Sequence, residues 1–213
     1  MVSYPILANI SIFSSVLPLL IGAFKFRQLS RGLVILISYI AFGLTIDIIS
    51  MWLITDYGIN LALMHFYYLI EYIFIMSIII CWQESPKIKR VFQGVLLVYI
   101  LFWFCAKITF EPLNGLYSLT ASISQIILAL SAGYTLFIVI GNRVQPLFSH
   151  QQFWVLTSVV VYFTGTLALI ALQGVLINFS REDIFLAASI NWSLKILFNI
   201  LFTIGFLCPQ TQP

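Results

Sequence analysis

Seven long apolar runs divide the sequence and decide what kind of chain this is. Each has about 17–26 residues, and a helix needs about 20 apolar residues, rising about 1.5 Å each, to cross a bilayer. The runs fall at residues 5–24, 32–55, 61–82, 91–107, 116–141, 152–176 and 184–207. Backbone groups in lipid must be paired within their own segment, so the runs predict helices. We therefore expect an all-α bundle of seven transmembrane helices, with residues 1–213 forming a single transmembrane domain.

The charged residues are too few to cover a water-facing surface. Of 213 residues, 10 are Lys or Arg and 7 are Asp or Glu, which makes 8% charged, while 62% are hydrophobic. Soluble domains carry about 25% charged residues. The composition excludes an ordinary soluble enzyme, a nucleic-acid binder and a disordered chain. The lipid bilayer is the expected surrounding of the chain, and nucleic acid is not an expected partner.

Basic residues between the runs predict the orientation, because short cytoplasmic loops are enriched in Lys and Arg. Seven fall on one side of the predicted bundle: Lys25, Arg27, Arg31, Lys87, Lys89, Arg90 and Arg143. The other side has two basic and four acidic residues: Lys107, Arg181, Asp56, Glu111, Glu182 and Asp183. We expect the N-terminus outside and the C-terminus in the cytoplasm. The basic loops would then offer a surface to a membrane or cytoplasmic partner protein.

Three charged residues lie inside the predicted spans, where a charge costs about 2.5–3.5 kcal/mol or more. They are Asp47 in the second run, Glu71 in the third and Lys195 in the seventh. Counting from the predicted outer ends places Glu71 and Lys195 about 15–17 Å deep, near the membrane midplane. An acid and a base at one depth predict a Glu71–Lys195 ion pair. The pair would either lock two helices together or belong to a functional site.

Further polar residues of the predicted spans share the outer half of the bundle. Asn191 precedes Lys195 by four residues and lies on the same helix face. Ser118, Ser122 and Gln125 form a stripe at i, i+4 and i+7. The complete set of candidate ligand-binding residues is Asp47, His65, Tyr68, Glu71, Gln125, Tyr162, Asn191 and Lys195. They predict a polar pocket for a small or lipid-like ligand, with interhelical hydrogen bonding as the alternative explanation.

Enzyme signatures are largely missing from the sequence. Its two histidines, His65 and His150, cannot build a multi-histidine metal site. The sequence contains no HExxH, GxSxG or P-loop motif. We expect no catalytic residues and no metal, although Glu71 or Asp47 could act as a base for water in an intramembrane hydrolase.

Two family resemblances add to this interpretation. The segment SINWSLKILFNILF resembles the retinal-attachment helix of microbial rhodopsins, which would make Lys195 the Schiff-base lysine and Glu71 its counterion. The segments LTIDIIS, HFYYLIEYIFI and FWVLTSVVVYFTGTLALIAL resemble small, uncharacterised seven-helix membrane proteins of Bacteroidetes-type bacteria. The second resemblance covers nearly the whole chain, implies a multi-pass protein of the bacterial inner membrane, and contains Asp47, Glu71 and Tyr162 in its recurring segments. It supplies no reaction and no ligand.

These observations favour a non-enzymatic module that senses or binds a ligand in the outer-half pocket, without a cofactor. A secondary transporter or ion pathway that uses Asp47 and Glu71 is the first alternative. A retinal protein with retinal on Lys195 is the second, and a membrane scaffold or assembly subunit is the third.

Overall fold

A computed structural model describes residues 6–56, 61–115, 118–141, 147–171 and 180–209. The longer helices are α1 Ile6–Ser14, α2 Val16–Phe24, α3 Arg31–Asp56, α4 Leu61–Cys81, α5 Pro86–Thr109, α6 Ser118–Gly141, α7 Gln151–Ala171 and α9 Arg181–Leu207. Two short 3-10 helices, Phe26–Gln28 and Leu147–Ser149, lie between them. The described part of the chain contains no strand, and seven of its segments are long and apolar enough to cross a membrane. The prediction of an all-α bundle of seven transmembrane helices is confirmed.

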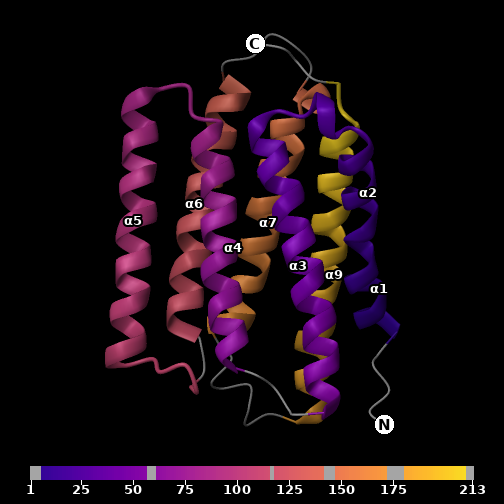
Figure 1. Cartoon of the computed structure of the whole chain (residues 1–213), viewed down its shortest axis with the longest axis vertical. Coiled ribbons are helices and arrows are strands. Elements are labelled where there is room, and N and C mark those ends of the chain that lie inside the picture. Colours follow the sequence, from indigo (N-terminus) through magenta and orange to yellow (C-terminus); the bar gives the residue numbers. More distant parts are fainter. Residues whose placement is uncertain (1–5, 57–60, 116–117, 142–146, 172–179, 210–213) are drawn as a thin grey trace.

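The helices stand side by side, with the two ends of the chain at opposite ends of the bundle (Figure 1). Nine of the 21 residues in α4 are buried, α4 has the largest buried share of any span, and this helix packs against α3, α5 and α6. α7 packs between α6 and α9, while α1 and α2 cover the far side of α9. α5 stands at one edge of the bundle and packs mainly against α4 and α6. The centre of the fold is therefore the space enclosed by α3, α4, α7 and α9.

The first predicted span is broken into two helices at Ser15. Pro18 has no backbone N–H to donate to the carbonyl four residues before it, so the helix loses a bond at this point. The hydroxyls of Ser14 and Ser15 donate instead to the carbonyls of Ser11 and Ile12, at 2.7 and 2.6 Å. Such a break is the expected effect of proline in a membrane helix. It brings Ser14 and Ser15 to the side of α9.

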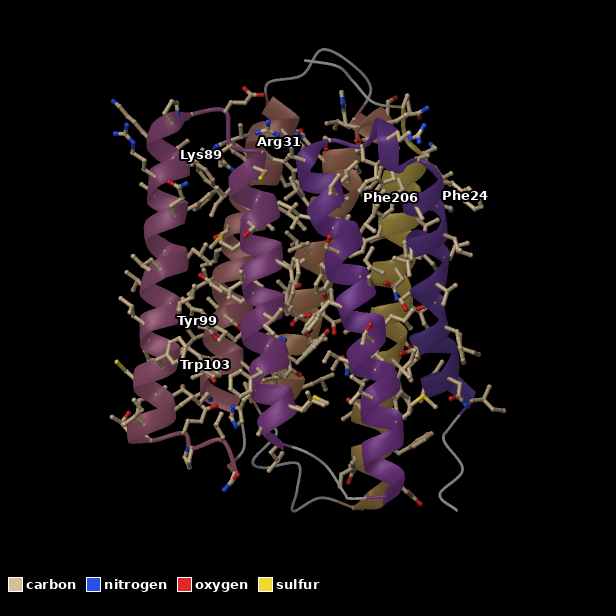
Figure 2. The ribbon with its side chains drawn as sticks, in the orientation of Figure 1. Phe24, Arg31, Lys89, Tyr99, Trp103 and Phe206 are labelled. Carbon is tan, nitrogen blue, oxygen red and sulfur yellow. The ribbon has the colours of Figure 1, made fainter. Side chains whose placement is uncertain are left out.

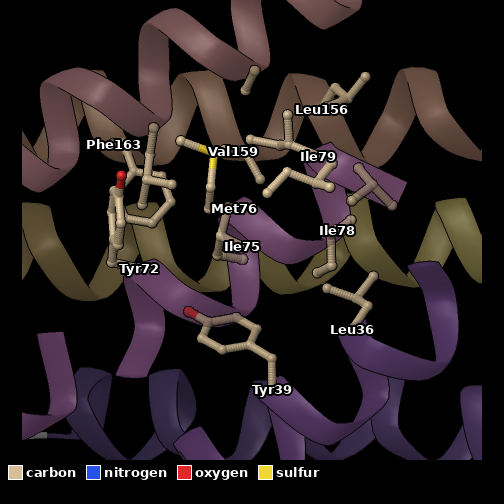
Figure 3. Packing of buried hydrophobic residues seen from close by; sticks show 14 of the residues in the cluster. Leu36, Tyr39, Tyr72, Ile75, Met76, Ile78, Ile79, Leu156, Val159 and Phe163 are labelled. Atoms are coloured by element: carbon tan, nitrogen blue, oxygen red, sulfur yellow. The ribbon is translucent and has the colours of Figure 1, made fainter. Parts of the chain in front are cut away.

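Apolar side chains fill the centre of the bundle (Figure 3). Tyr72, Ile75, Met76 and Ile79 of α4 are fully buried. They meet side chains of α3 and α7, such as Leu36 and Phe163 (Figure 3). Close approach of α3 and α4 depends on Gly32, because a Cβ there would lie 2.6 Å from the indole nitrogen of Trp82. Small residues at helix contacts are typical of membrane bundles.

The outer faces of the helices are apolar, and several basic residues lie toward one end of the bundle. Large side chains such as Phe24, Ile108 and Phe137 are 87%, 85% and 76% exposed, which suits lipid and not water. Arg31 and Lys89 lie toward the same end of the bundle as Phe24 and Phe206 (Figure 2). Arg143 falls outside the described residues. These features identify a multi-pass membrane protein in contact with the lipid bilayer.

Candidate functional site

Lys195 pairs with Asp47, which corrects the predicted Glu71–Lys195 pair. The ammonium Nζ of Lys195 on α9 donates to the carboxylate Oδ2 of Asp47 on α3 at 2.5 Å. Both side chains keep 21% of their surface exposed. Counting residues along each span places a charge at a depth in the membrane, but it does not say which neighbouring helix the side chain faces. Lys195 and Asp47 do lie near enough to Glu71 to act on it electrostatically.

Glu71 is held by two tyrosine hydroxyls. Its Oε1 accepts from Tyr39 of α3 at 2.7 Å and from Tyr67, one turn earlier on α4, at 3.1 Å. The residue is only 2% exposed. Two hydroxyl donors converging on one oxygen partly replace the hydration that a buried carboxyl group loses. Glu71 therefore lies behind the two tyrosines, separated from the ion pair.

The Asp47–Lys195 pair lines a small cavity. The cavity has a volume of about 20 Å³ open to water, which is room for one or two molecules. Its polar lining residues are Ser15, Tyr39, Asp47, Tyr67, Tyr162, Lys195 and Asn199. The tyrosines that hold Glu71 therefore face the same space as the ion pair. We call this space the charged cavity.

A second and larger cavity lies beside the first, between α4, α7 and α9. Its volume is about 170 Å³. Tyr68, Tyr162, Thr166 and Asn191 supply its polar lining, and its other walls are Leu169, Ile170, Ala187 and Ala188. Tyr162 lines both cavities, so its ring forms the wall between them. We call this space the amphipathic cavity.

A polar stripe on α9 connects the cavities to α1. Asn191, Lys195 and Asn199 follow one another at intervals of four residues, which places them on one helix face. The amide of Asn199 donates to the hydroxyl of Ser14 at 2.7 Å, and Thr203 continues the stripe by one more turn. The sequence prediction included Asn191 and Lys195 but missed Asn199. The i, i+4, i+8 spacing was the available signal.

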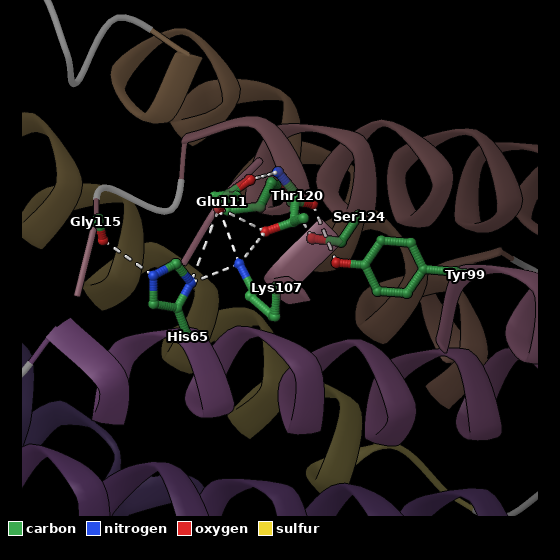
Figure 4. Close-up of polar contacts among 8 residues, drawn as sticks. His65, Tyr99, Lys107, Glu111, Gly115, Thr120 and Ser124 are labelled. Atoms are coloured by element: carbon green, nitrogen blue, oxygen red, sulfur yellow. Dashed lines mark hydrogen bonds and ion pairs between the residues drawn. The ribbon is translucent and has the colours of Figure 1, made fainter. Parts of the chain in front are cut away.

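His65 lies outside this site, in a separate cluster with Lys107, Glu111 and Thr120 (Figure 4). Its Nδ1 lies 2.7 Å from the ammonium of Lys107, and its Nε2 lies 3.0 Å from the carbonyl of Gly115. Lys107 also donates to Glu111 at 3.0 Å and to Thr120 at 3.1 Å. From the sequence, Lys107 and Glu111 are expected to be charges of a loop on one side of the bundle. Their side chains are in fact only 6% exposed, because the turn after α5 folds back onto the bundle.

Gln125 is also separate from the two cavities. The residue is 1% exposed on α6, and its Oε1 has no hydrogen-bond partner among the described residues. Ser124 beside it donates to the carbonyl of Ala121 at 2.7 Å. The predicted stripe on α6 therefore supplies a buried polar residue, but this residue does not line either cavity. Within the described ranges, no three His, Cys, Asp or Glu residues lie close enough together to hold a metal ion.

Comparisons with family models, with curated proteins and with solved structures found no match to this chain.

Proposed function

We propose that this protein binds a small amphipathic ligand inside its membrane bundle, in the amphipathic cavity and the adjacent charged cavity. The observation that carries the proposal is the position of the Asp47–Lys195 pair. A pair that only locked two helices would be expected in a sealed contact. Here both charged groups keep about a fifth of their surface exposed and line a cavity. Ionisable groups that face a cavity within the membrane are biased toward function.

The lining residues indicate the chemistry of the ligand. Leu169, Ile170 and Ala187 offer an apolar wall, and Tyr68 and Asn191 offer hydrogen bonds on the other side. Lys195 lies one turn beyond Asn191 on the same face of α9. An amphiphile with a short apolar part in the amphipathic cavity would reach Lys195 with an anionic group. That group would compete with Asp47 for the ammonium.

Competition for Lys195 would also explain how binding is sensed. The backbones of α3 and α9 have few contacts with each other, so the Asp47–Lys195 pair is a main link between them. A ligand that takes the ammonium from Asp47 weakens this link and favours a different spacing of the two helices. A membrane or cytoplasmic partner protein at the basic end would detect the change.

Thermal unfolding of the purified protein with three probes tests the proposal. We expect octanoate, an anionic amphiphile with a short apolar part, to raise the unfolding midpoint, its methyl ester to raise it less, and glucose to leave it unchanged. Tyr162→Trp places a larger ring where the two cavities meet. It should block entry of the amphiphile and abolish the rise in the unfolding midpoint. Leu130→Trp, at a side chain 69% exposed on α6, is the matched control and should keep it. Equal responses in both variants would show that the amphiphile acts on the outer surface, and would overturn the proposal.

A proton or cation pathway is the second candidate, and one observation favours it. Tyr39 and Tyr67 contact Glu71 and also face the cavity that holds Asp47. Two carboxyl groups joined by hydroxyls and one or two waters form a chain along which a proton can move. In liposomes that contain a pH-sensitive dye, this function requires proton uptake that Glu71→Gln abolishes. Uptake unchanged in Glu71→Gln would contradict it.

The retinal alternative remains a prediction. Lys195 has a carboxylate partner in Asp47, and a protonated Schiff base needs such a partner. The space beside Lys195, about 20 Å³, would have to widen to hold the polyene. Purification with added all-trans retinal tests the alternative: it requires a visible absorption band that Lys195→Ala removes.

We also propose that the end of the bundle with Lys25, Arg31 and Lys89 faces the cytoplasm of a bacterial cell, which places the N-terminus outside the inner membrane. Burial of Lys107 against Glu111 supports this orientation, because it removes one of the two basic residues counted on the opposite side. A membrane-impermeant maleimide should label Asn114→Cys but not Lys87→Cys in intact cells, with the native cysteines replaced by serine. The reverse labelling would contradict the orientation.

A further inference from the structure

The His65 cluster joins three helices through one ammonium group (Figure 4). His65 belongs to α4, Lys107 to the last turn of α5, and Thr120 to the first turn of α6. Glu111, in the turn between α5 and α6, accepts from the backbone N–H of Thr120 at 3.0 Å and from its hydroxyl at 2.8 Å. A carboxylate at this position also interacts favourably with the N-terminus of α6. These contacts fix the end of α5 to its two neighbours.

The contacts of His65 define where its proton lies. A carbonyl oxygen only accepts, so the contact with Gly115 at 3.0 Å requires the proton on Nε2. Nδ1 of the neutral ring is then an acceptor, and Lys107 donates to it at 2.7 Å. The three protons of the ammonium are all used, by His65, Glu111 and Thr120. The cluster therefore fits a neutral histidine and a charged lysine.

A second proton on His65 has no place in this arrangement. Nδ1–H would point at the Lys107 ammonium, replacing a hydrogen bond with a contact between two donors and two positive charges. Among the described residues, the charged groups that face the ring are Lys107 from α5 and Glu111 from the turn, whose Oε1 lies 3.8 Å from Nδ1. α6 contributes Thr120, which does not titrate. The protonated ring would have to take Glu111 from Lys107 or push Lys107 away.

The helix that this cluster holds is the one with the fewest other attachments. α5 stands at the edge of the bundle (Figure 1), and only about a fifth of its residues are buried. Its principal contacts are with α4 and α6, the two helices that the cluster joins to it. Loss of the Lys107 contacts would therefore act mainly on the α5 end and on the turn that follows it.

We infer that the cluster of His65, Lys107, Glu111 and Thr120 is a pH-sensitive latch that holds the end of α5 against α4 and α6 while His65 is neutral, and releases it when His65 takes up a proton. The sign follows from the contacts. The neutral ring accepts from Lys107, so the latch is intact at high pH. It opens as pH falls far enough for the ring to take up a second proton. On the predicted orientation, the latch responds to acidity outside the cell.

Hydrogen–deuterium exchange of the full-length protein in nanodiscs tests the latch. The reporters are the amides of Phe110, Glu111, Gly115 and Thr120, all hydrogen-bonded in the closed cluster. After correction for the intrinsic effect of pH on exchange, their rates should rise about tenfold or more from pH 8 to pH 5. This is the change expected when one charge-assisted hydrogen bond is lost. Amides of α7 should not respond. A wild-type protein whose reporters do not change with pH overturns the inference.

Two variants identify the titrating group. His65→Asn keeps an acceptor for Lys107 but cannot take up a proton, so its reporters should lose the pH response and stay slow. Lys107→Gln removes the ammonium that holds the latch closed, so its reporters should exchange fast at both pH values and lose the pH response, and this variant serves if His65→Asn does not fold. His150→Asn, at the other histidine of the chain, is the matched control and should respond as wild type does. A response that persists in both His65→Asn and Lys107→Gln would assign the titration to another group and overturn the latch.

Discussion

Lys195 on α9 donates to Asp47 on α3 at 2.5 Å, while Glu71 on α4 accepts from Tyr39 and Tyr67. The two acids are thus stabilised in different ways. Asp47 has a positive charge as its partner, and Glu71 has two neutral donors. Removing a charge from the first pair leaves an uncompensated charge, whereas removing a hydroxyl from the second leaves only a weaker hydrogen-bond network.

Single removal of either charge of the Asp47–Lys195 pair should destabilise the bundle. Asp47→Asn leaves the Lys195 ammonium unpaired, and Lys195→Met leaves the carboxylate unpaired. We expect the free energy of unfolding of each variant to fall by about 1–3 kcal/mol. This is less than the loss of a fully buried pair would cause, because both side chains are partly exposed. The double variant Asp47→Asn/Lys195→Met should recover most of this loss. Denaturation in mixed micelles gives the free energies for a double-mutant cycle.

The same cycle with Glu71 separates the observed pair from the predicted one. Glu71→Gln combined with Lys195→Met should show a smaller coupling energy than Asp47→Asn combined with Lys195→Met. A larger coupling for Glu71 would mean that the lysine pairs with Glu71 in the membrane, contrary to the ion pair described here.

The two tyrosines that hold Glu71 should contribute unequally. Tyr39→Phe removes a hydrogen bond of 2.7 Å to Glu71, and Tyr67→Phe removes one of 3.1 Å. Tyr39→Phe should therefore lower the free energy of unfolding more. Polar contacts in membrane bundles contribute about 0.6 kcal/mol on average and about 1.7 kcal/mol at most, and both losses should fall in this range. In the Glu71→Gln variant, Tyr39→Phe should lower the free energy of unfolding by less than it does in the wild-type protein, because the carboxylate that accepts from Tyr39 is already replaced by a weaker acceptor. An undiminished cost would show that the Tyr39 hydroxyl acts through another group.

The fold could be predicted from sequence because hydropathy and span length are one-dimensional properties. A run of about 20 apolar residues has one stable form in lipid, and the seven runs were sufficient to predict the seven helices. The three intramembrane charges were also found correctly, since Asp47, Glu71 and Lys195 are each obvious against their neighbours. Their partners were not predictable in the same way. Depth comes from counting along the chain, but pairing depends on how each helix is rotated and which helix lies beside it.

The His65 cluster could not be predicted from the sequence for a related reason. Lys107 and Glu111 fall at the end of the fourth predicted span, where charged residues normally reach water. Nothing in their spacing reveals that the turn folds back and buries both side chains. The i, i+4 spacing of Lys107 and Glu111 is compatible with an exposed pair and with a buried one. The pair is buried because α6 packs over the turn. This packing depends on contacts between separate segments, which the local spacing of residues does not show.

Loss of the Glu111 carboxylate should be the most damaging charge removal at this end of the bundle. Glu111→Gln weakens the contacts to Lys107 and to the N-terminal turn of α6, and we expect a loss of about 1–3 kcal/mol. Glu182→Gln is the matched control, because Glu182 is exposed in the first turn of α9 and should change stability by less than about 0.5 kcal/mol. Thermal unfolding of both variants at pH 7.5 makes the comparison. Equal midpoints would contradict the buried position of Glu111.

Gly32 should tolerate no side chain, although glycine is normally a poor helix residue. A Cβ at this position would lie 2.6 Å from Nε1 and 2.9 Å from Cε2 of Trp82, and a rigid indole cannot yield as a flexible chain can. Gly32→Ala should therefore separate α3 from α4 at the basic end and lower stability. Gly94→Ala on α5 is the control, since nothing lies within 4 Å of its Cβ position. Gly94→Ala should leave the free energy of unfolding unchanged or raise it by about 0.5–1 kcal/mol. A stabilising Gly32→Ala would contradict this contact between the two helices.

The three cysteines should differ in reactivity toward a small alkylating reagent. Cys208 is buried beyond the end of α9, and its Sγ lies 3.6 Å from the carbonyl of Phe148, whereas Cys81 and Cys105 are exposed on the outer face of the bundle. Burial raises the pKa of the Cys208 thiol above its ordinary value, so less of it is thiolate, the reactive form, at neutral pH. In detergent, iodoacetamide should modify Cys208 slowly at pH 7.5, and the rate should still be rising well above pH 9. Peptide mass spectrometry follows each site separately. Rapid modification of Cys208 at pH 7.5, in a protein that remains folded by circular dichroism, would show that the end of α9 opens from the 3-10 helix Leu147–Ser149.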